Sequence, residues 1–135
     1  MTSTTIPEVI LVTSSYDHTI RYWEALSGIC VRTLQHVDSQ VNRLAISQDK
    51  RLLAAAGNPS VRLFDTNTGT QVSSFAHTAN VTSVQFQATS RWIATSSEDS
   101  SIKIWDVRAP NVQRDYQLKV FIFNLVSCKR SFNSS

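Results

Sequence analysis

Hydrophobic and polar positions alternate in three short segments of the chain. Each segment carries two apolar positions separated by a basic residue and leads to an aromatic ring. The apolar pairs are Ile20/Tyr22, Val61/Leu63 and Ile102/Ile104. Alternation with a period of two is typical of strands that have one face more buried than the other. β-branched residues and serine are frequent and no long 3.6-residue stripe appears, so the pattern predicts strands and no helices.

The three segments belong to a repeat of forty-one residues. The positions that recur at this interval are the rings Trp23, Phe64 and Trp105, the turn residues Asp17, Asn58 and Asp99, His36 with His77, and Gly28 with Gly69. Around the rings the copies align without gaps. The step from His36 to Val41 is one residue longer than the step from His77 to Val81. We expect the turn that begins at Ser47 to restore the count.

Eleven short strands follow from this alignment. We expect them at 9–14, 19–24 and 30–34, then at 41–47, 52–56, 61–64 and 71–75, and finally at 81–87, 92–97, 102–106 and 112–117. The first copy has one strand fewer because 1–8 is rich in threonine and contains a proline. The organisation expected is an N-terminal extension at 1–8, a partial first unit at 9–34, a second unit at 41–75, a third at 81–117 and a divergent tail at 118–135.

A repeat of this length, with four short strands and a Trp-Asp dipeptide, resembles the WD repeat of β-propellers. Trp105-Asp106 is that dipeptide, and Phe64-Asp65 and Trp23-Glu24 are variants of it. The fold class expected is therefore all-β, an incomplete WD-repeat propeller.

In WD propellers a histidine, a hydroxyl, the turn aspartate and the tryptophan form a hydrogen-bonded tetrad. The resemblance assigns this role in the third unit to His77, Thr95 or Ser97, Asp99 and Trp105. His77, Ser97 and Asp99 also match the residue types of a catalytic triad. Nothing in the sequence marks the oxyanion site or cleft that catalysis needs, so the structural role is favoured and no enzyme is expected.

The other two units depart from the tetrad pattern. In the second unit Phe64 has no N–H to donate and Asn58 replaces the aspartate. We therefore expect His36 to lack the full network and apolar packing to hold this unit. In the first unit Asp17 and Trp23 are present, but no matching histidine precedes them.

Charge and composition exclude several classes of protein. The 135 residues carry a net charge of +3, and Lys119, Lys129 and Arg130 supply all of it. The body is balanced, which argues against the clustered basic face of a nucleic-acid-binding protein. No apolar run is long enough for a transmembrane helix, and the N-terminus does not resemble a secretory signal. Cys30, Cys128 and His18 have no second ligand at metal spacing, so we expect no metal, no cofactor and a reduced intracellular setting.

Five strings carry a closer resemblance. They are YDHTIRYW at 16–23, LSGIC at 26–30, QHVDSQVN at 35–42, AAAGN at 54–58 and SSED at 96–99. They resemble the WD-repeat subunit of the target-of-rapamycin (TOR) kinase complexes, the lethal-with-sec-thirteen family, with fungal-type members nearest. The resemblance runs from about residue 9 to residue 116 and concerns the N-terminal part of the family.

The resemblance implies a seven-bladed, non-catalytic scaffold that binds and stabilises the catalytic domain of the TOR-type Ser/Thr kinase and meets other complex subunits. Such a protein is expected in the cytoplasm and, through the kinase complex, at endomembranes. We expect Gln40 and Asn42 to be exposed polar contacts beside a buried Val41, with Tyr16 and His18 as secondary contacts. The alternatives for these positions are solvated turns. The alternatives for the chain are a WD adaptor of another assembly, or a fragment without independent function.

The sequence also departs from this family. Seven blades need roughly 280–320 residues, so this chain has about three of them. The family supplies the missing outer partner strand of the first blade from its far C-terminus. The segment at 118–126 is instead a nearly continuous apolar run, as in a truncated or alternatively spliced product. We therefore expect uncovered blade edges and self-association.

Overall fold

A computed structural model describes residues 9–37, 39–109 and 112–117, with the backbone alone for Val112 and Gln113. Its strands are β1 (Ile10–Ser14), β2 (Thr19–Glu24), β3 (Cys30–Gln35), β4 (Arg43–Ile46), β5 (Leu52–Ala56), β6 (Ser60–Asp65), β7 (Gln71–Ala76), β8 (Val81–Phe86), β9 (Trp92–Ser97), β10 (Ser101–Asp106) and β11 (Val112–Gln117). The all-β class predicted from the sequence is confirmed. Within these residues no helix is present that could cross a membrane.

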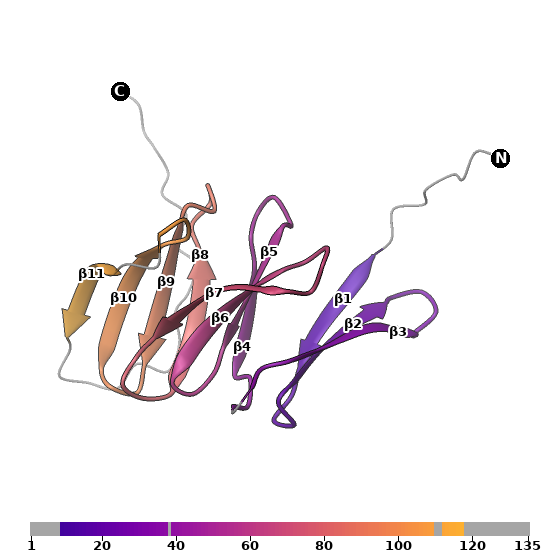
Figure 1. The fold of residues 1–135 in the computed structure, drawn as a ribbon, viewed down its shortest axis with the longest axis horizontal. Helices are drawn as coiled ribbons and strands as arrows, with labels where there is room; N and C mark the ends of the chain where they lie inside the picture. The colour runs from indigo at the N-terminus through magenta and orange to yellow at the C-terminus, as the bar shows by residue number, and fades with distance from the viewer. Residues whose placement is uncertain (1–8, 38, 110–111, 118–135) are drawn as a thin grey trace.

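The strands form three antiparallel sheets in chain order. Sheet 1 is β1-β2-β3, sheet 2 is β4-β5-β6-β7 and sheet 3 is β8-β9-β10-β11. Sheet 2 stands between the other two, so the sheets follow one another like the blades of a fan (Figure 1). The first strands β4 and β8 make the closest approach between sheets 2 and 3. The expected extension at 1–8 and tail at 118–135 lie outside the described residues.

Two apolar clusters hold the sheets together. The cluster between sheets 1 and 2 consists of Ile20, Tyr22, Val41, Leu53, Ala55 and Phe64. The cluster between sheets 2 and 3 consists of Ala54, Ala56, Val61, Leu63, Phe75, Val81, Val84, Ile93 and Trp105. Because successive side chains of a strand point to opposite faces, β5 serves both clusters with four consecutive small or branched residues.

The alignment of the second copy predicted from the sequence is wrong in one place. β5 pairs Leu53 with Phe64, eleven residues apart, whereas β9 pairs Ile93 with Trp105, twelve residues apart. The turn between β5 and β6 is therefore one residue shorter than its counterpart. The turn after Ser47 has the same length as the turn in sheet 3 and does not restore the count. As a result Ala55, rather than Ala54, occupies the place of Thr95.

Sheet 1 has three strands in the part of the chain that the structure describes. β1 pairs Leu11 with Trp23, as β9 pairs Ile93 with Trp105, so β1 corresponds to β5 and β9. The strand that sheet 1 lacks is therefore the counterpart of β4 and β8. These two strands lie at the inner side of the fan, so the expectation of a missing outer strand is wrong.

Candidate binding surface

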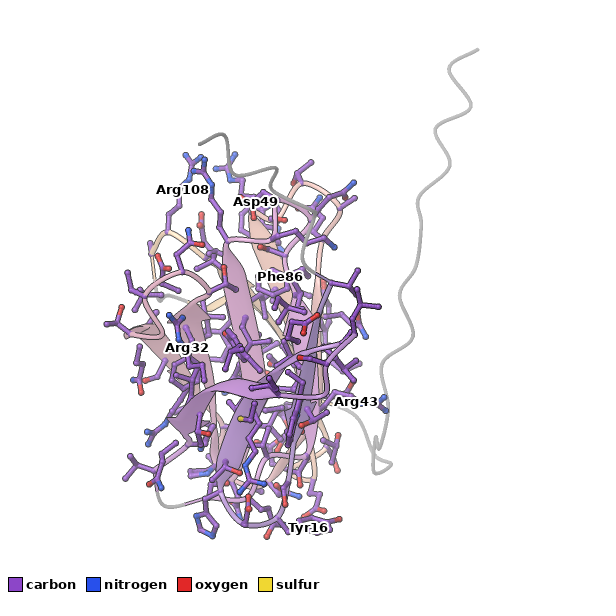
Figure 2. The ribbon with its side chains drawn as sticks, turned by 90° about the vertical axis from the view of Figure 1, so that its right-hand side faces the viewer. Tyr16, Arg32, Arg43, Asp49, Phe86 and Arg108 are labelled. Atoms are coloured by element: carbon purple, nitrogen blue, oxygen red, sulfur yellow. The ribbon has the colours of Figure 1, made fainter. Side chains whose placement is uncertain are left out.

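Five connections lie together at one end of the three sheets. We call it the Tyr16 end, and it comprises the residues 15–18, 36–37, 39–42, 57–59, 77–80 and 98–100. Tyr16 marks this end in Figure 2, and Asp49 and Arg108 mark the opposite one. The expected contact residues fall at the Tyr16 end, as do the histidines and the turn residues Asp17, Asn58 and Asp99 of the expected tetrads.

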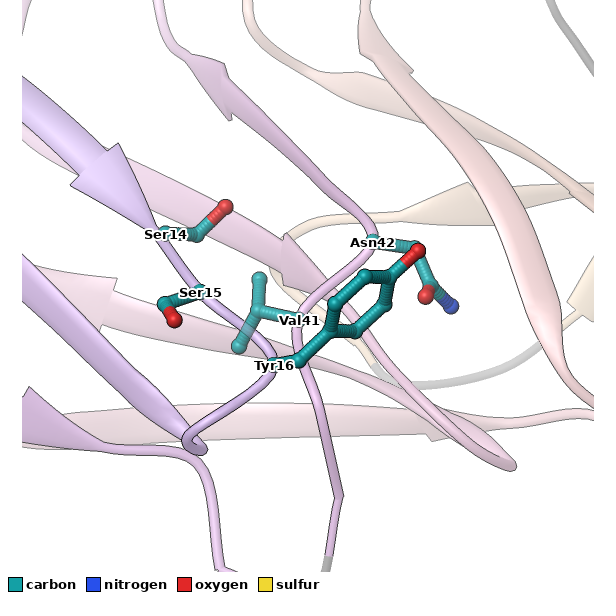
Figure 3. Close-up of a pocket in the computed structure, with 5 residues that line it drawn as sticks. All are labelled: Ser14, Ser15, Tyr16, Val41 and Asn42. Atoms are coloured by element: carbon teal, nitrogen blue, oxygen red, sulfur yellow. The ribbon is translucent and has the colours of Figure 1, made fainter.

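A shallow pocket opens at this end between sheets 1 and 2. It has a volume of about 420 Å³ and is lined by Ser14, Ser15, Tyr16, Val41 and Asn42. The amide of Val41 donates a hydrogen bond of 3.3 Å to the carbonyl of Ser15, which joins the two loops. Tyr16 is 76% exposed, and its ring extends over Val41 toward Asn42 (Figure 3). The pocket thus combines an aromatic wall with polar side chains.

The two residues expected to be exposed on either side of Val41 differ in burial. Gln40 is exposed and Val41 is buried, as the sequence predicts. Asn42 is half-buried, and its Nδ2 donates to Oδ1 of Asn80 at 2.6 Å and to the carbonyl of Val81 at 3.0 Å. The expectation that Asn42 is a freely exposed contact is therefore wrong, because its amide nitrogen bridges sheets 2 and 3.

Two further residues shape the loops at this end. His18 is exposed and has a φ of 71°, in the turn position that Ser100 occupies with a φ of 68° in sheet 3. The carbonyl of His18 accepts a hydrogen bond from the amide of His36 at 2.8 Å. Ser39, which the sequence did not single out, is buried and accepts a hydrogen bond from the amide of Asn58 at 2.5 Å. These hydrogen bonds therefore fix the backbone at His36 and at Asn58.

A chain of largely buried hydrogen bonds ties His77, in the connection between β7 and β8, to sheet 3. Nε1 of Trp105 donates to Oγ1 of Thr95 at 2.9 Å, and that oxygen lies 2.6 Å from Nε2 of His77. Nδ1 of His77 lies 2.9 Å from Oγ of Ser101, whose hydroxyl donates to the carboxylate of Asp99. His77, Thr95, Asp99 and Trp105 thus come together, with Ser101 as an additional member that the sequence did not reveal.

The donors and acceptors in this chain define the tautomer of His77. The proton of Ser101 is directed to Asp99, so its oxygen accepts from Nδ1–H of His77. Nε2 then accepts the hydroxyl proton of Thr95, whose oxygen accepts from the indole of Trp105. The shorter contact of the Thr95 hydroxyl is with Nε2, at 2.6 Å, and the carbonyl of Lys103 lies farther away, at 3.5 Å. Each proton of the chain therefore has an acceptor when His77 is neutral, and the 3.4 Å approach of Nδ1 to Asp99 is not an ion pair.

Electrostatics agree with this assignment. Burial lowers the pKa of His77 below its ordinary value, Lys103 adds to the shift, and the nearby carboxylate of Asp99 only partly offsets it. Burial by itself would raise the pKa of Asp99, but hydrogen bonds from the side chains and backbone of Ser101 and Thr78 hold it far below its usual value. A neutral imidazole beside an ionised carboxylate therefore persists at neutral pH.

Ser97 lies outside this chain of hydrogen bonds. Its hydroxyl donates to the carbonyl of Asn80 at 2.8 Å and accepts from the amide of Asp99 at 3.3 Å. Of the two hydroxyl candidates in the third unit, the structure places Thr95 beside His77 and gives Ser97 to the turn.

Among the residues that the structure describes, the corresponding chain of hydrogen bonds is absent between sheets 1 and 2. His36 is fully buried, and neither of its ring nitrogens has a hydrogen-bond partner among the described side chains and backbone. Ala55 and Phe64 replace the hydroxyl and the indole. Burial, with a smaller contribution from Arg62, lowers the pKa of His36, although backbone groups such as that of Ala55 oppose the shift.

The shortened turn brings backbone against this ring. A Cβ atom placed on Gly57 would lie 2.6 Å from Cε1 of His36 and 2.7 Å from Oγ of Ser39. Such distances do not occur between unstrained atoms, so the close approach requires glycine. His36 is thus held by contact with the Gly57 backbone and the apolar cluster.

Sheet 1 carries part of the same arrangement on its outward face. Nε1 of Trp23 donates to Oγ1 of Thr13 at 2.8 Å, and Asp17 accepts from the amide of Thr19 at 3.0 Å. No histidine stands beside this pair in the described part of the chain. The indole faces away from sheet 2, in the direction that Trp105 uses to meet sheet 2.

Comparison with known families decides the class of repeat. The family described as "WD domain, G-beta repeat" matches residues 28–65 and 69–106, which make up more than half of the chain. The chain belongs to the WD-repeat family. The predicted fold class, an incomplete WD β-propeller, is thereby confirmed.

WD-repeat relatives extend the similarity to one group of proteins. The chain is 62% identical to "Target of rapamycin complex subunit wat1" of Schizosaccharomyces pombe over 82% of its length, and 60% identical to "Target of rapamycin complex subunit LST8" of Saccharomyces cerevisiae over 81%. It is 43% identical to "Non-functional target of rapamycin complex subunit LST8-2" of Arabidopsis thaliana, over 81% of the chain and 36% of that protein. The resemblance to TOR complex subunits seen in the sequence is confirmed.

The chain spans about 36% of the length of the wat1 protein and 37% of the LST8 protein. Within the WD repeats, the side chain of His77 is fully buried. A substrate has no access to this imidazole. Residues 9–37, 39–109 and 112–117 also contain no group of three His, Cys, Asp or Glu side chains placed to hold a metal ion.

Proposed function

We propose that this chain is a non-catalytic scaffold that binds and stabilises the catalytic domain of a TOR-type Ser/Thr kinase and meets other subunits of its complex. The observation that carries the proposal is the identity of 60% or more with two TOR complex subunits across four-fifths of the chain. A protein with this role acts in the cytoplasm and, with its complex, at endomembranes.

The Tyr16 end is the surface we propose for the kinase. Tyr16 offers a large exposed ring, and rings of this kind are frequent among residues that dominate binding energy. Gln40 adds an exposed amide, His18 adds an exposed imidazole on the same turn as Tyr16, and Asn42 lines the pocket. The sheets beneath are locked by buried contacts, so these loops meet a partner with little loss of conformational entropy.

Co-purification of the full chain with a TOR-type kinase catalytic domain tests the proposal, with the LST8 protein of S. cerevisiae as positive control. The double variant Tyr16→Ala/Gln40→Ala is expected to weaken association at least about tenfold. Its matched control is Leu26→Ala/Gln48→Ala, which removes an exposed apolar side chain and an exposed amide at the opposite end. Circular dichroism should be unchanged in both variants.

The outcomes distinguish a failure of the proposed scaffold role from a failure of the proposed contact surface. If the LST8 control binds and the full chain does not, the scaffold role is wrong for this chain. If the full chain binds and the two double variants weaken association equally, the role stands and the Tyr16 end is not the contact.

A further inference from the structure

Sheets 1 and 3 each present an outward face that no described residue covers. The outward face of sheet 1 carries Leu11, Thr13 and Trp23, and Leu11 is 55% exposed. The outward face of sheet 3 carries Ile102 and Tyr116, and Tyr116 is 51% exposed. These two faces stand at opposite ends of the fan (Figure 1).

Strand register makes the face of sheet 1 the counterpart of a buried internal face. Leu11 pairs with Trp23 as Ile93 pairs with Trp105, and Thr13 holds the indole of Trp23 as Thr95 holds that of Trp105. In sheet 3 this face is buried against sheet 2. The same side chains in sheet 1 have no sheet of described residues in front of them.

The face of sheet 3 is the counterpart of the partner in that internal contact. Ile102 pairs with Tyr116 across β10 and β11, as Val61 pairs with Phe75 across β6 and β7. Val61 and Phe75 are buried, and the Phe75 ring packs on Trp105 with 4.9 Å between ring centroids. Tyr116 therefore occupies the position from which an aromatic ring meets a tryptophan of the next sheet.

A pocket on sheet 1 stands where such a ring would pack. It has a volume of about 280 Å³, and Leu11, Thr13, Trp23, Glu24, Ala25 and Gly28 line it. Leu11 and the indole of Trp23 give it apolar walls. The pocket is thus suited to the ring of a tyrosine or phenylalanine side chain.

Charge adds an independent match. Arg32 of sheet 1 donates to the carbonyl of Thr66 at 3.0 Å. Hydrogen bonds from Thr68 and Asn67 lower the pKa of the neighbouring Asp65, and the charge of Arg32 lowers it further. Arg114 pairs with Ile104 as Arg32 pairs with Tyr22, so Arg114 is the counterpart of Arg32 on the open face. Forty-one residues before Asp65 stands Glu24, at the pocket on sheet 1. A basic side chain on one open face thus corresponds to an acidic side chain on the other.

We propose that a second copy of this chain docks head to tail, with the outward face of its sheet 3 covering the outward face of sheet 1. Tyr116 of one copy packs on Trp23 of the other, and Arg114 approaches Glu24. The contact repeats the one between sheets 2 and 3. It joins different surfaces of two identical chains, so it closes a ring or extends a chain of copies.

Light scattering during size-exclusion chromatography of the full chain tests this proposal at roughly 100 μM, well above the dissociation constant of a weak specific interface. The wild-type chain is expected to exceed the monomer mass of 15.1 kDa. Leu11→Lys and Tyr116→Lys, each on one open face, are expected to be monomers with unchanged circular dichroism. An equimolar mixture of the two variants is expected to form a dimer, because one intact pair of faces remains.

Val72→Lys is the matched control, since Val72 is 54% exposed on β7 away from both faces, and it should associate as the wild type does. A monomeric wild-type chain would overturn the proposal. So would self-association that Tyr116→Lys leaves intact, since that result means like faces pair with like. A mixture that stays monomeric would also contradict the head-to-tail contact.

Discussion

The two internal contacts of the fan hold equivalent histidines in different ways. Between sheets 2 and 3, His77 sits in the middle of a directed chain of hydrogen bonds from Trp105 to Asp99. Between sheets 1 and 2, His36 is equally buried but has no described hydrogen-bond partner for either ring nitrogen. A repeated residue therefore does not carry a repeated interaction.

The difference arises because sheet 2 lacks the hydroxyl, the indole and one of the turn residues that sheet 3 has. In sheet 2, Ala55 replaces the hydroxyl that donates to the histidine, and Phe64 replaces the indole that donates to that hydroxyl. The turn between β5 and β6 is one residue shorter, and the backbone of Gly57 moves against the ring. A buried polar group without a partner loses the hydration it had in the unfolded chain, so this contact must be stabilised by its apolar cluster.

Replacing each histidine with leucine should give the largest difference between the two contacts. We expect His77→Leu to lower the free energy of unfolding by about 2 kcal/mol more than His36→Leu, because it breaks the two hydrogen bonds that His77 makes with Thr95 and Ser101. Urea denaturation of the two variants measures the difference. Equal losses would mean that the hydrogen bonds of His77 contribute nothing beyond packing.

Gly57→Ala should have the next largest effect. The new methyl group would overlap the buried ring of His36, so we expect a loss of about 1–3 kcal/mol, as in other overpacked cores. In a His36→Ala background the clash is relieved and the loss should be smaller. A double-mutant cycle measures this coupling, and purely additive effects would contradict the contact.

Trp105→Phe should cost about 1 kcal/mol, because it removes one neutral hydrogen bond and keeps most of the ring packing. Trp23→Phe removes the same type of bond at an exposed site and should cost less. Thermal or urea unfolding compares the two variants. A larger loss of unfolding free energy for Trp23→Phe would show that burial does not determine how much this hydrogen bond contributes to stability.

Mild acidification should have the smallest effect near neutral pH. Folding lowers the pKa of His77 and of His36 below the ordinary value of 6.5, so the folded chain binds fewer protons than the unfolded chain does. Stability should therefore be fully present above pH 6.5 and decrease as the pH falls below it. Unfolding measured across pH, with the two leucine variants, assigns the loss to each ring. Stability that rises on acidification would contradict both shifts.

The strands could be predicted because the interval of forty-one residues fixes alternation, turns and rings at once. The alignment inside sheet 2 could not be predicted in the same way. The longer step from His36 to Val41 hides the shorter turn at Gly57, and the total interval stays at forty-one. Ala54, Ala55 and Ala56 are identical in sequence, so composition does not reveal which of them replaces the threonine.

The members of the hydrogen-bonded chain were only partly evident from the sequence. The recurring histidine, aspartate and tryptophan were found by their spacing, but Ser101 is one of several serines between 96 and 101. Thr19, Ser60 and Ser101 do recur at forty-one residues, which is the signal that would have found it. Asn42 was misjudged because its acceptors, Asn80 and Val81, come from the neighbouring sheet.

The protonation of His77 tests the central claim most directly. Nitrogen-15 NMR distinguishes the two neutral tautomers and the imidazolium, and the chain has three histidines, which single variants assign. At pH 7 we expect His77 to be neutral with its proton on Nδ1. A proton on Nε2, or a charged ring at that pH, would contradict the directed chain of hydrogen bonds from Trp105 to Asp99.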